Sequence, residues 1–172
     1  LKRNFLTNSS CGVCGKTSLD SIEVLKKEKL DLSFPLIKEE IIMKAPKLLI
    51  NKQSEFAKTG GIHASALISD NGDVVSTRED VGRHNALDKL IGHTLNNKTI
   101  DPKRQFLACS GRLNFELVQK GLMANIGLIA GVGAPTSLAI DLAKRYNMTL
   151  LGFVKENSFN IYSNIDRVII NT

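Results

Sequence analysis

The chain contains 172 residues, of which 42% are hydrophobic and 23% charged, proportions typical of a folded globular domain. No apolar run approaches the roughly 20 residues that span a membrane, no signal peptide is recognisable, and three cysteines are too few for a disulfide framework. We therefore expect a cytoplasmic protein with no membrane partner. The net charge of +6 favours an anionic partner, but scattered cations, two tyrosines and no tryptophan argue against a nucleic-acid-binding surface.

The first informative segment is Cys11-Gly12-Val13-Cys14-Gly15, a C-x-x-C motif held between glycines. Glycines permit a tight, accessible loop, and cations such as the neighbouring Lys16 lower the pKa of a thiol. Two such thiols can form a disulfide, carry sulfur or supply half of a zinc site, and the local residues leave these alternatives open. Capping-box spacing from Thr17 to Asp20 then predicts a helix over residues 18–29.

The middle of the sequence combines helical and strand patterns. Three helices are predicted there, over residues 38–45, 47–56 and 83–95. The first two are separated by Pro46, because proline lacks the N–H that a helix interior needs. Residues 63–68 and 74–77 are predicted as the strands of a hairpin, because they flank Asp70-Asn71-Gly72-Asp73 and Asn-Gly is a strong turn signal.

The second half of the chain alternates strands with helices in a regular order. The predicted strands are residues 106–109, 128–131 and 149–154, and the predicted helices are residues 114–123 and 135–146. Such alternation predicts an α/β fold in which half of the sheet is largely parallel. Residues 1–33, which carry the cysteine loop and the first helix, are expected to belong to the same domain as residues 34–172.

Polar and glycine residues gather where the predicted strands end, which is where ligand sites lie in open α/β sheets. Arg83-His84-Asn85 stands at a helix start, and three such groups there suit an anion. A capped helix with solvated charges is the alternative. The turn Ser110-Gly111-Arg112 follows a strand in the same way. Gly60-Gly61 and His63 form a further candidate, although a lone histidine at a strand start also has a purely structural explanation.

Six segments together resemble one protein family. They are Cys-Gly-Val-Cys-Gly at 11–15, Thr-Gly-Gly-Ile-His-Ala at 59–64, Glu-Asp-Val-Gly-Arg-His-Asn-Ala-Leu-Asp-Lys at 79–89, Ser-Gly-Arg at 110–112, Ala-Pro-Thr-Ser-Leu-Ala at 134–139 and Leu-Gly-Phe at 151–153. In this order they resemble the formate dehydrogenase accessory sulfurtransferase family, FdhD, over essentially the whole chain. Family members usually carry a further region ahead of the cysteine pair, and this chain begins at Leu1, so we expect part of a longer protein.

The resemblance implies a cytidine-deaminase-like three-layer α/β sandwich with a mixed sheet, preceded by the C-x-x-C loop and its helix. Zinc deaminases use H-x-E at a helix start and P-C-x-x-C at the next strand-to-helix junction. His84 occupies the first position, but Ala86 replaces the glutamate, and no second cysteine follows Cys109. We therefore expect neither a metal site nor deaminase-like hydrolysis.

The resemblance further implies that the chain is an enzyme, a sulfurtransferase. Family members take persulfide sulfur from a cysteine desulfurase and pass it to the molybdenum (or tungsten) bis(molybdopterin guanine dinucleotide) cofactor, which a formate dehydrogenase then receives. By family position Cys11 carries the persulfide, and Cys14 lowers its pKa, accepts sulfur in turn or resolves it as a disulfide. The chain is expected to hold no cofactor tightly and to form a homodimer.

The same resemblance indicates where the molybdenum cofactor, as a substrate, is expected to bind. The family's binding segment matches Phe153, Val154, Lys155, Glu156, Asn157 and Ser158, with Lys155 as the expected phosphate partner. The site is expected to be completed by Gly60, Gly61, His63, Arg83, His84, Asn85, Ser110, Gly111 and Arg112. GDP and GMP are expected to bind as fragments of the cofactor, and the net positive charge suits its two pyrophosphates.

Two other functions stay open on the C-x-x-C motif alone. A dithiol-disulfide oxidoreductase would exchange disulfides through the cysteine pair, but it would leave the glycine-rich loops unexplained. A zinc-binding interaction module would need further ligands, and His63, His84 and His93 are distant in the sequence.

Overall fold

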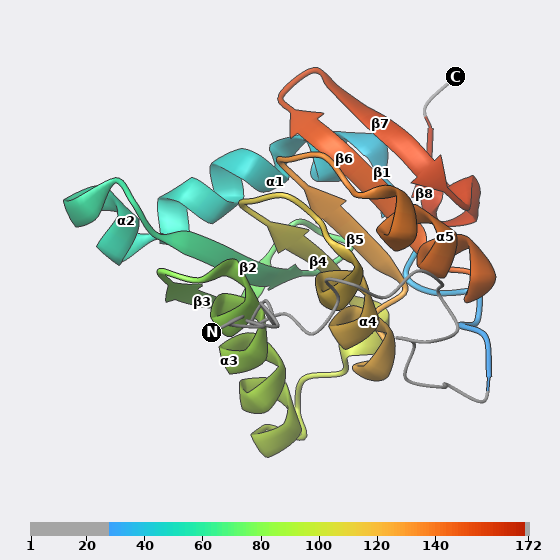
Figure 1. Cartoon of the computed structure of the whole chain (residues 1–172), viewed down its shortest axis with the longest axis horizontal. Coiled ribbons are helices and arrows are strands. Elements are labelled where there is room, and N and C mark those ends of the chain that lie inside the picture. Colours follow the sequence, from blue (N-terminus) through green and yellow to red (C-terminus); the bar gives the residue numbers. More distant parts are fainter. Residues whose placement is uncertain (1–27, 171–172) are drawn as a thin grey trace, which may run out of the picture.

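The structure, a computed structural model, describes residues 28–170 (Figure 1). The cysteine loop and most of the helix predicted over residues 18–29 lie outside the described residues; Glu28 and Lys29, at the end of that prediction, are not helical. The helices are α1 (Glu39–Lys52), α2 (Ser54–Thr59), α3 (Arg83–Asn96), α4 (Phe115–Met123) and α5 (Ser137–Arg145). The strands are β1 (Ile37–Lys38), β2 (His63–Ile68), β3 (Val74–Asp80), β4 (Phe106–Cys109), β5 (Leu128–Gly131), β6 (Thr149–Lys155), β7 (Ser158–Ser163) and β8 (Val168–Ile169).

Six strands form one mixed sheet in the order β3-β2-β4-β5-β6-β7. β4, β5 and β6 run parallel to one another, whereas β2 is antiparallel to both of its neighbours and β7 is antiparallel to β6. The predicted α/β class with a mixed sheet is therefore confirmed. A separate parallel pair joins β1 to β8.

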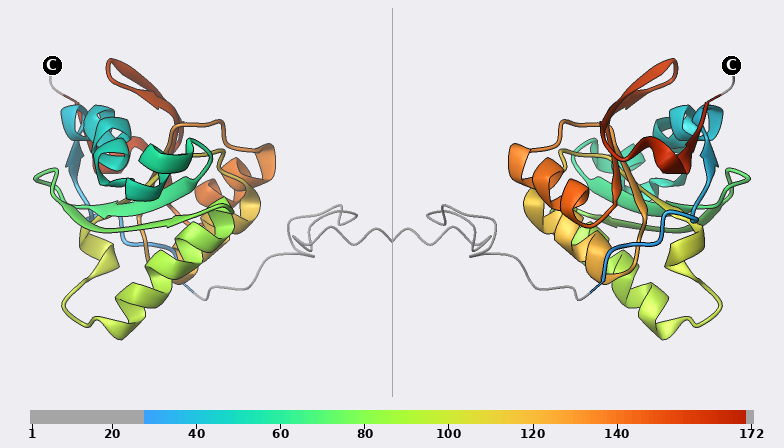
Figure 2. Two further views of the ribbon diagram at one scale, coloured as in Figure 1. Left: turned by 90° about the vertical axis from the view of Figure 1, so that its left-hand side faces the viewer. Right: turned by 90° about the vertical axis from the view of Figure 1, so that its right-hand side faces the viewer.

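Side chains alternate across this sheet and build an apolar core on each face. In β4, Phe106 and Ala108 face one core, and Leu107 and Cys109 face the other. The first core is covered by α1, whereas the second is covered by α3, α4 and α5 (Figures 1 and 2). Helices therefore shield both faces of the central strands, which explains why those strands read as continuous apolar runs.

The predicted break at Pro46 is wrong, because α1 continues through this residue and ends at Lys52. Ile42, Ala45 and Leu49 lie on both sides of Pro46 and are buried in the core beneath α1. Burying an Ile or Leu side chain contributes about 1.5–3 kcal/mol, so two of them offset the roughly 3 kcal/mol cost of an interior proline.

Other elements differ from the sequence prediction as well: β3 continues to Asp80, beyond the predicted end at residue 77. α5 begins at Ser137 rather than at residue 135, because the Thr136 hydroxyl caps the helix by accepting the Ala139 N–H at 3.3 Å. The hairpin strand β7 was not predicted, since it is mostly exposed and lacks a run of buried residues. Within residues 28–170, none of the helices has the length and apolar character needed to cross a membrane.

Candidate functional site

The directions of the strands bring most of the predicted site to one edge of the sheet, called here the carboxyl edge, where β3, β4, β5 and β6 end. Because β2 is antiparallel to β3 and β4, it starts at the same edge: His63 pairs with Asp80, and Ser65 pairs with Cys109. The carboxyl edge therefore collects the segment 60–63, the start of α3 and the turn 110–112 (Figure 1).

Ser110 ties the start of β2 to the end of β4. Its Oγ accepts the Ala64 N–H at 2.9 Å and lies 3.2 Å from His63 Nδ1. A serine hydroxyl has one proton and two acceptor lone pairs, so Oγ can accept from the amide and still donate to Nδ1 or accept from it, according to the tautomer of the ring. Gly111 makes room for this ring, because a Cβ there would stand 3.2 Å from both Nδ1 and Cε1 of His63.

Two arginines adjoin the same glycine turn. Arg83 lies against Gly111: the Arg83 Cδ is 3.5 Å from the position that a Cβ on Gly111 would occupy. The Arg83 Nε is buried and has no hydrogen-bond partner within residues 28–170. Arg112 is exposed, and its backbone packs on Gly133, where a Cβ would come within 2.8 Å. Guanidinium groups placed in this way suit a phosphate oxygen.

The segment 153–158 forms the end of β6 and the turn into β7, and its residues lie in different environments. Phe153 has a left-handed φ of 52° and donates its N–H to the Gly133 carbonyl at 3.3 Å, so it adjoins the carboxyl edge. Val154 is buried in the core under α1. The remaining predicted residues of the segment are exposed, namely Lys155, Glu156, Asn157 and Ser158.

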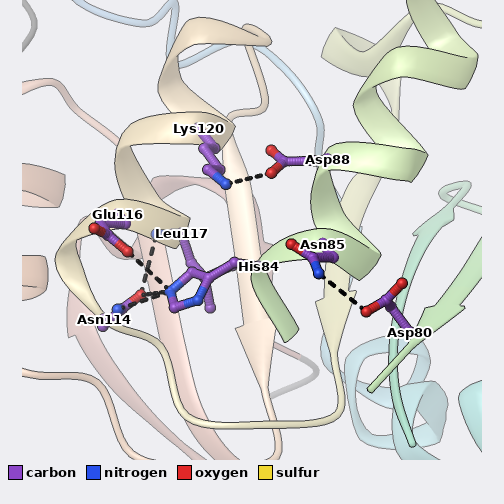
Figure 3. Close-up of polar contacts among 8 residues, drawn as sticks. All are labelled: Asp80, His84, Asn85, Asp88, Asn114, Glu116, Leu117 and Lys120. Atoms are coloured by element: carbon purple, nitrogen blue, oxygen red, sulfur yellow. Dashed lines mark hydrogen bonds and ion pairs between the residues drawn. The ribbon is translucent and has the colours of Figure 1, made fainter. Parts of the chain in front are cut away.

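His84 contacts the start of α4 (Figure 3). Its Nε2 lies 2.9 Å from Asn114 Nδ2, 3.2 Å from Asn114 Oδ1 and 3.1 Å from Glu116 Oε2. Asn114 is also the N-cap of α4, accepting the Leu117 N–H at 3.2 Å. His84 therefore connects α3 to α4. One helical turn further on, the ion pair between Asp88 and Lys120, 2.6 Å long, connects the same two helices.

Asp80 organises the start of α3. One carboxylate oxygen accepts the Gly82 N–H at 3.0 Å and the Asn85 side-chain amide at 3.2 Å, and the other pairs with Lys89. The hydrogen bond from Lys89, followed by that from Gly82, holds the pKa of Asp80 at about 2 instead of 3.8. Asn85 is thus bound to a carboxylate at the helix start, and of the three predicted residues only Arg83 adjoins the Gly111 turn.

A cavity of about 350 Å³ lies where α1 and α2 meet the carboxyl edge, and the sequence analysis did not predict its outer wall. It is lined by the predicted Gly60, Gly61, His63 and Ser110, together with Pro46, Leu49, Ile50, Gln53, Phe56, Ile62 and Val132. The sequence analysis predicted helices in this region and assigned none of their residues to a site. The one feature of the sequence that could have indicated this wall is Gln53, a polar residue between two apolar stretches.

Cys109 and His84 occupy the positions of zinc ligands in deaminases, but their surroundings in this structure are not those of a metal site. Cys109 is buried, and burial raises the pKa of its thiol to about 12, with Ser65 Oγ 3.8 Å from the sulfur. His84 is engaged by Asn114 and Glu116, as described above. Within the described part of the chain, no three side chains of His, Cys, Asp or Glu come together as metal ligands would.

Comparison with known proteins agrees with this architecture. The fold resembles the crystal structure of a candidate formate dehydrogenase accessory protein from Desulfotalea psychrophila, with a TM-score of 0.75 and 26% identity. That match covers 83% of this chain and 61% of the other. The fold and the glycine-lined carboxyl edge thus define a mixed α/β domain similar to that of this solved structure.

The chain belongs to the FdhD/NarQ family, whose model matches residues 1–169. It is 45% identical over 171 residues to the sulfur carrier protein FdhD of Streptomyces coelicolor, covering 99% of this chain and 61% of the relative. It is 43% identical over 166 residues to the protein of the same name from Sulfolobus acidocaldarius, covering 96% and 63%. The chain therefore spans about three fifths of the length of these relatives.

Proposed function

We propose that the protein is a sulfur carrier that receives persulfide sulfur from a cysteine desulfurase and transfers it to the molybdenum or tungsten bis(molybdopterin guanine dinucleotide) cofactor of a formate dehydrogenase. Membership of the FdhD/NarQ family supports the sulfur-carrying role. The observation that carries the cofactor's part of the proposal concerns Arg83 beside the Gly111 turn: its buried Nε has no hydrogen-bond partner among the described residues 28–170. An anionic ligand would supply that partner.

The chemistry assigned to the cysteine pair follows from thiol reactivity. The Cys11 thiolate attacks the outer sulfur of the donor's persulfide, a new S–S bond forms on Cys11, and the donor's thiolate leaves. The metal centre of the cofactor, which is the substrate, then receives the sulfur as hydrosulfide: the Cys14 thiolate attacks the Cys11 sulfur, a Cys11–Cys14 disulfide forms, and the outer sulfur leaves with the electron pair of the broken S–S bond. A thiol reductant restores the two cysteines for the next cycle. Both cysteines lie outside the described residues, so their role rests on the sequence and the family.

The test is intact-mass spectrometry after incubation with a cysteine desulfurase and free cysteine. We expect a gain of one or more sulfur atoms that a reductant removes, and Cys11→Ala should abolish it. Cys109→Ala is the matched control, because a buried thiol with a raised pKa supplies little thiolate and should not carry the sulfur. Undiminished loading of Cys11→Ala would contradict the proposal, and an internal disulfide without added sulfur would favour an oxidoreductase.

The second prediction concerns the anionic ligand. GDP should bind with its phosphates at Arg83 and Arg112, so that Arg83→Ala or Arg112→Ala weakens binding about tenfold or more, as expected for a lost charged hydrogen bond. Arg104→Ala is the matched control, because Arg104 precedes β4 and so lies toward the opposite end of that strand. Calorimetry that gives the same GDP affinity for both arginine variants and wild type would place the phosphates elsewhere.

A further inference from the structure

A groove of about 370 Å³ lies between α3 and α4, which are neighbouring helices in Figure 1, and is called here the α3–α4 groove. Its lining residues are Asp88, Ile91, Leu95, Gln119, Lys120, Met123 and Ala124. Leu95 is 76% exposed and Met123 is 53% exposed, although both are large apolar side chains. Exposed apolar side chains gathered around a groove indicate a surface that another segment or molecule covers.

The shape and charge of the α3–α4 groove suit the apolar face of a helix. Asp88, Ile91 and Leu95 follow the spacing i, i+3, i+7, so they form one stripe along α3. The two charged lining residues neutralise each other, because Lys120 Nζ lies 2.6 Å from Asp88 Oδ2 (Figure 3). The other lining residues carry no charge, so the groove favours apolar packing over binding of an ion.

The described part of the chain begins beside one end of this groove. Glu28 and Lys29 line a small cavity together with Asn125. Asn125 directly follows Ala124, which is part of the groove wall. Leu30 is buried in the same core against which Ala124 packs. The residues before Glu28 are therefore attached to the domain within a few residues' reach of the groove, since each extended residue spans about 3.3–3.6 Å.

Residues 18–27, which precede this point, have the sequence pattern of an occupant. They lie outside the described residues, and their sequence predicts an amphipathic helix in which Leu19, Ile22 and Leu25 share one face. These apolar residues would span about 9 Å along a helix, comparable to the roughly 10.5 Å of the α3 stripe. A helix shorter than about 12–15 residues is marginal in water, so it needs an apolar surface to pack on.

We propose that residues 18–27 bind in the α3–α4 groove, with their apolar face packed against Leu95 and Met123. The short connection to Leu30 favours this occupant, because short linkers hold a segment at an effective concentration of about a millimolar. A second protein fits less well: seven residues line the groove, whereas a stable interface between two proteins uses about 20–30 residues on each side. Because the C-x-x-C motif lies just before this segment, its binding would set where the cysteine pair is attached to the folded domain.

The test is hydrogen exchange of the full chain, followed by mass spectrometry for the amides of residues 18–27. These amides should be protected in wild type, and Leu95→Glu or Met123→Glu should speed their exchange at least about tenfold, because a charge in the groove opposes apolar packing. Val75→Glu is the matched control, since Val75 is an exposed apolar residue of β3 outside the groove. Circular dichroism verifies that the variants are folded, as their exposed positions lead us to expect.

A reciprocal experiment follows the methyl group of Met123 by NMR. Ile22→Ser should move its resonance toward that of a solvent-exposed methionine, because the apolar face of the segment is interrupted. Met148 is fully buried in the core and should keep its resonance. Lys27→Ser is the control within the segment, because Lys27 lies on the opposite side of the predicted helix and should leave Met123 unchanged.

The inference is overturned if the amides of residues 18–27 exchange at the rate of an unfolded chain in wild type, which would leave the groove to another protein. It is equally overturned if the folded groove variants keep the wild-type protection, or if Ile22→Ser leaves the Met123 resonance in place. A Met123 resonance that moves on dilution, together with a change of mass in sedimentation, would show that a second copy covers the groove instead. None of these results bears on the proposed function, since persulfide loading is measured separately by mass.

Discussion

At the scale of single residues, Asp80 makes the start of α3 sensitive to acid. Its pKa of about 2 in the folded protein is below the 3.8 of an unperturbed aspartate, so the folded state favours the charged form. The resulting stabilisation is therefore fully present above about pH 4 and is lost as the pH falls through the folded pKa toward 2. Because solvent reaches the Asp80 carboxylate, added salt should weaken its stabilising interaction with Lys89.

We predict that Lys89→Met raises the pKa of Asp80 toward its ordinary value, because Lys89 is the first cause of the lowered pKa. Titration of the Asp80 side-chain carboxyl by NMR measures this pKa directly. Lys98→Met, which removes an exposed lysine just beyond α3, should leave it unchanged. In denaturant unfolding, Asp80→Asn should lose stability less steeply than wild type between pH 4 and 2.5. Equal slopes would contradict the assignment.

Three consecutive residues of the predicted site have side chains that point to different partners in the structure. Successive residues of a helix point about 100° apart, so Arg83, His84 and Asn85 at the start of α3 cannot all face one ligand. Arg83 meets Gly111, His84 meets Asn114, and Asn85 meets Asp80. The sequence could predict that a polar cluster stands at this strand end. It could not predict which member faces the site, because that depends on where α4 and β4 pack.

At the scale of elements, α2 depends on a side chain from β3. The helix has no buried residue, and its first turn is capped by Glu79, whose carboxylate accepts the Glu55 N–H at 3.1 Å and the Phe56 N–H at 3.0 Å. A capping carboxylate also interacts favourably with the positive end of a helix. Because Phe56 lines the cavity, this cap also positions part of the cavity wall.

We predict that Glu79→Ala loosens α2 while leaving the sheet intact. The loss of an N-cap acceptor costs about 1 kcal/mol, so the Glu55 and Phe56 amides should exchange with solvent several-fold faster. Hydrogen exchange followed by NMR measures both amides separately. Asp141→Ala, which removes an exposed carboxylate from α5, is the control. Unchanged exchange in α2 would show that other contacts hold the helix.

Most strands and helices could be predicted from the sequence, because their apolar periodicity matches the two cores. β2, β4 and β5 have the predicted bounds, and α4 begins one residue after the predicted position because Asn114 is its cap. α1 differs because tertiary burial overrides the local effect of Pro46. The cavity wall was missed because a single sequence does not distinguish an apolar residue that lines a cavity, such as Phe56, from a core residue.

At the scale of the whole molecule, Arg167 joins segments that are far apart in the chain. Its side chain is fully buried and donates to the carbonyl oxygens of Phe34 at 2.7 Å, Asn147 at 2.6 Å and Asp31 at 2.5 Å. Burial lowers the pKa of Arg167. Gly127 leaves the space for it, because a Cβ there would stand 2.7 Å from Arg167 Nε and 2.8 Å from the Phe34 carbonyl oxygen.

This arrangement fixes the segment by which the cysteine-bearing part of the sequence is connected to the sheet. Residues 31–34 follow that part in the chain, and Arg167, close to β8, holds them against the loop that precedes β6. Nearby, the Leu30 N–H is donated to the Tyr146 carbonyl at 3.0 Å, and β1 pairs with β8. Removing the guanidinium should therefore affect global stability and the anchoring of residues 31–34 together.

We predict that Arg167→Met lowers the free energy of unfolding by about 3 kcal/mol, because at least two charged hydrogen bonds of about 1.5 kcal/mol each are lost. Arg167→Lys should be intermediate, since an ammonium cannot reproduce the spread of donors that reaches three carbonyls. Urea unfolding followed by circular dichroism measures these differences. Arg104→Met is the matched control: its exposed guanidinium also touches this segment, 5.7 Å from the centre of the Phe34 ring, and lies 3.9 Å from Asp101, but such exposed contacts are weak, so the loss should stay at or below about 1 kcal/mol. If Arg167→Met is no less stable than Arg104→Met, the buried guanidinium does not hold the two ends of the domain together.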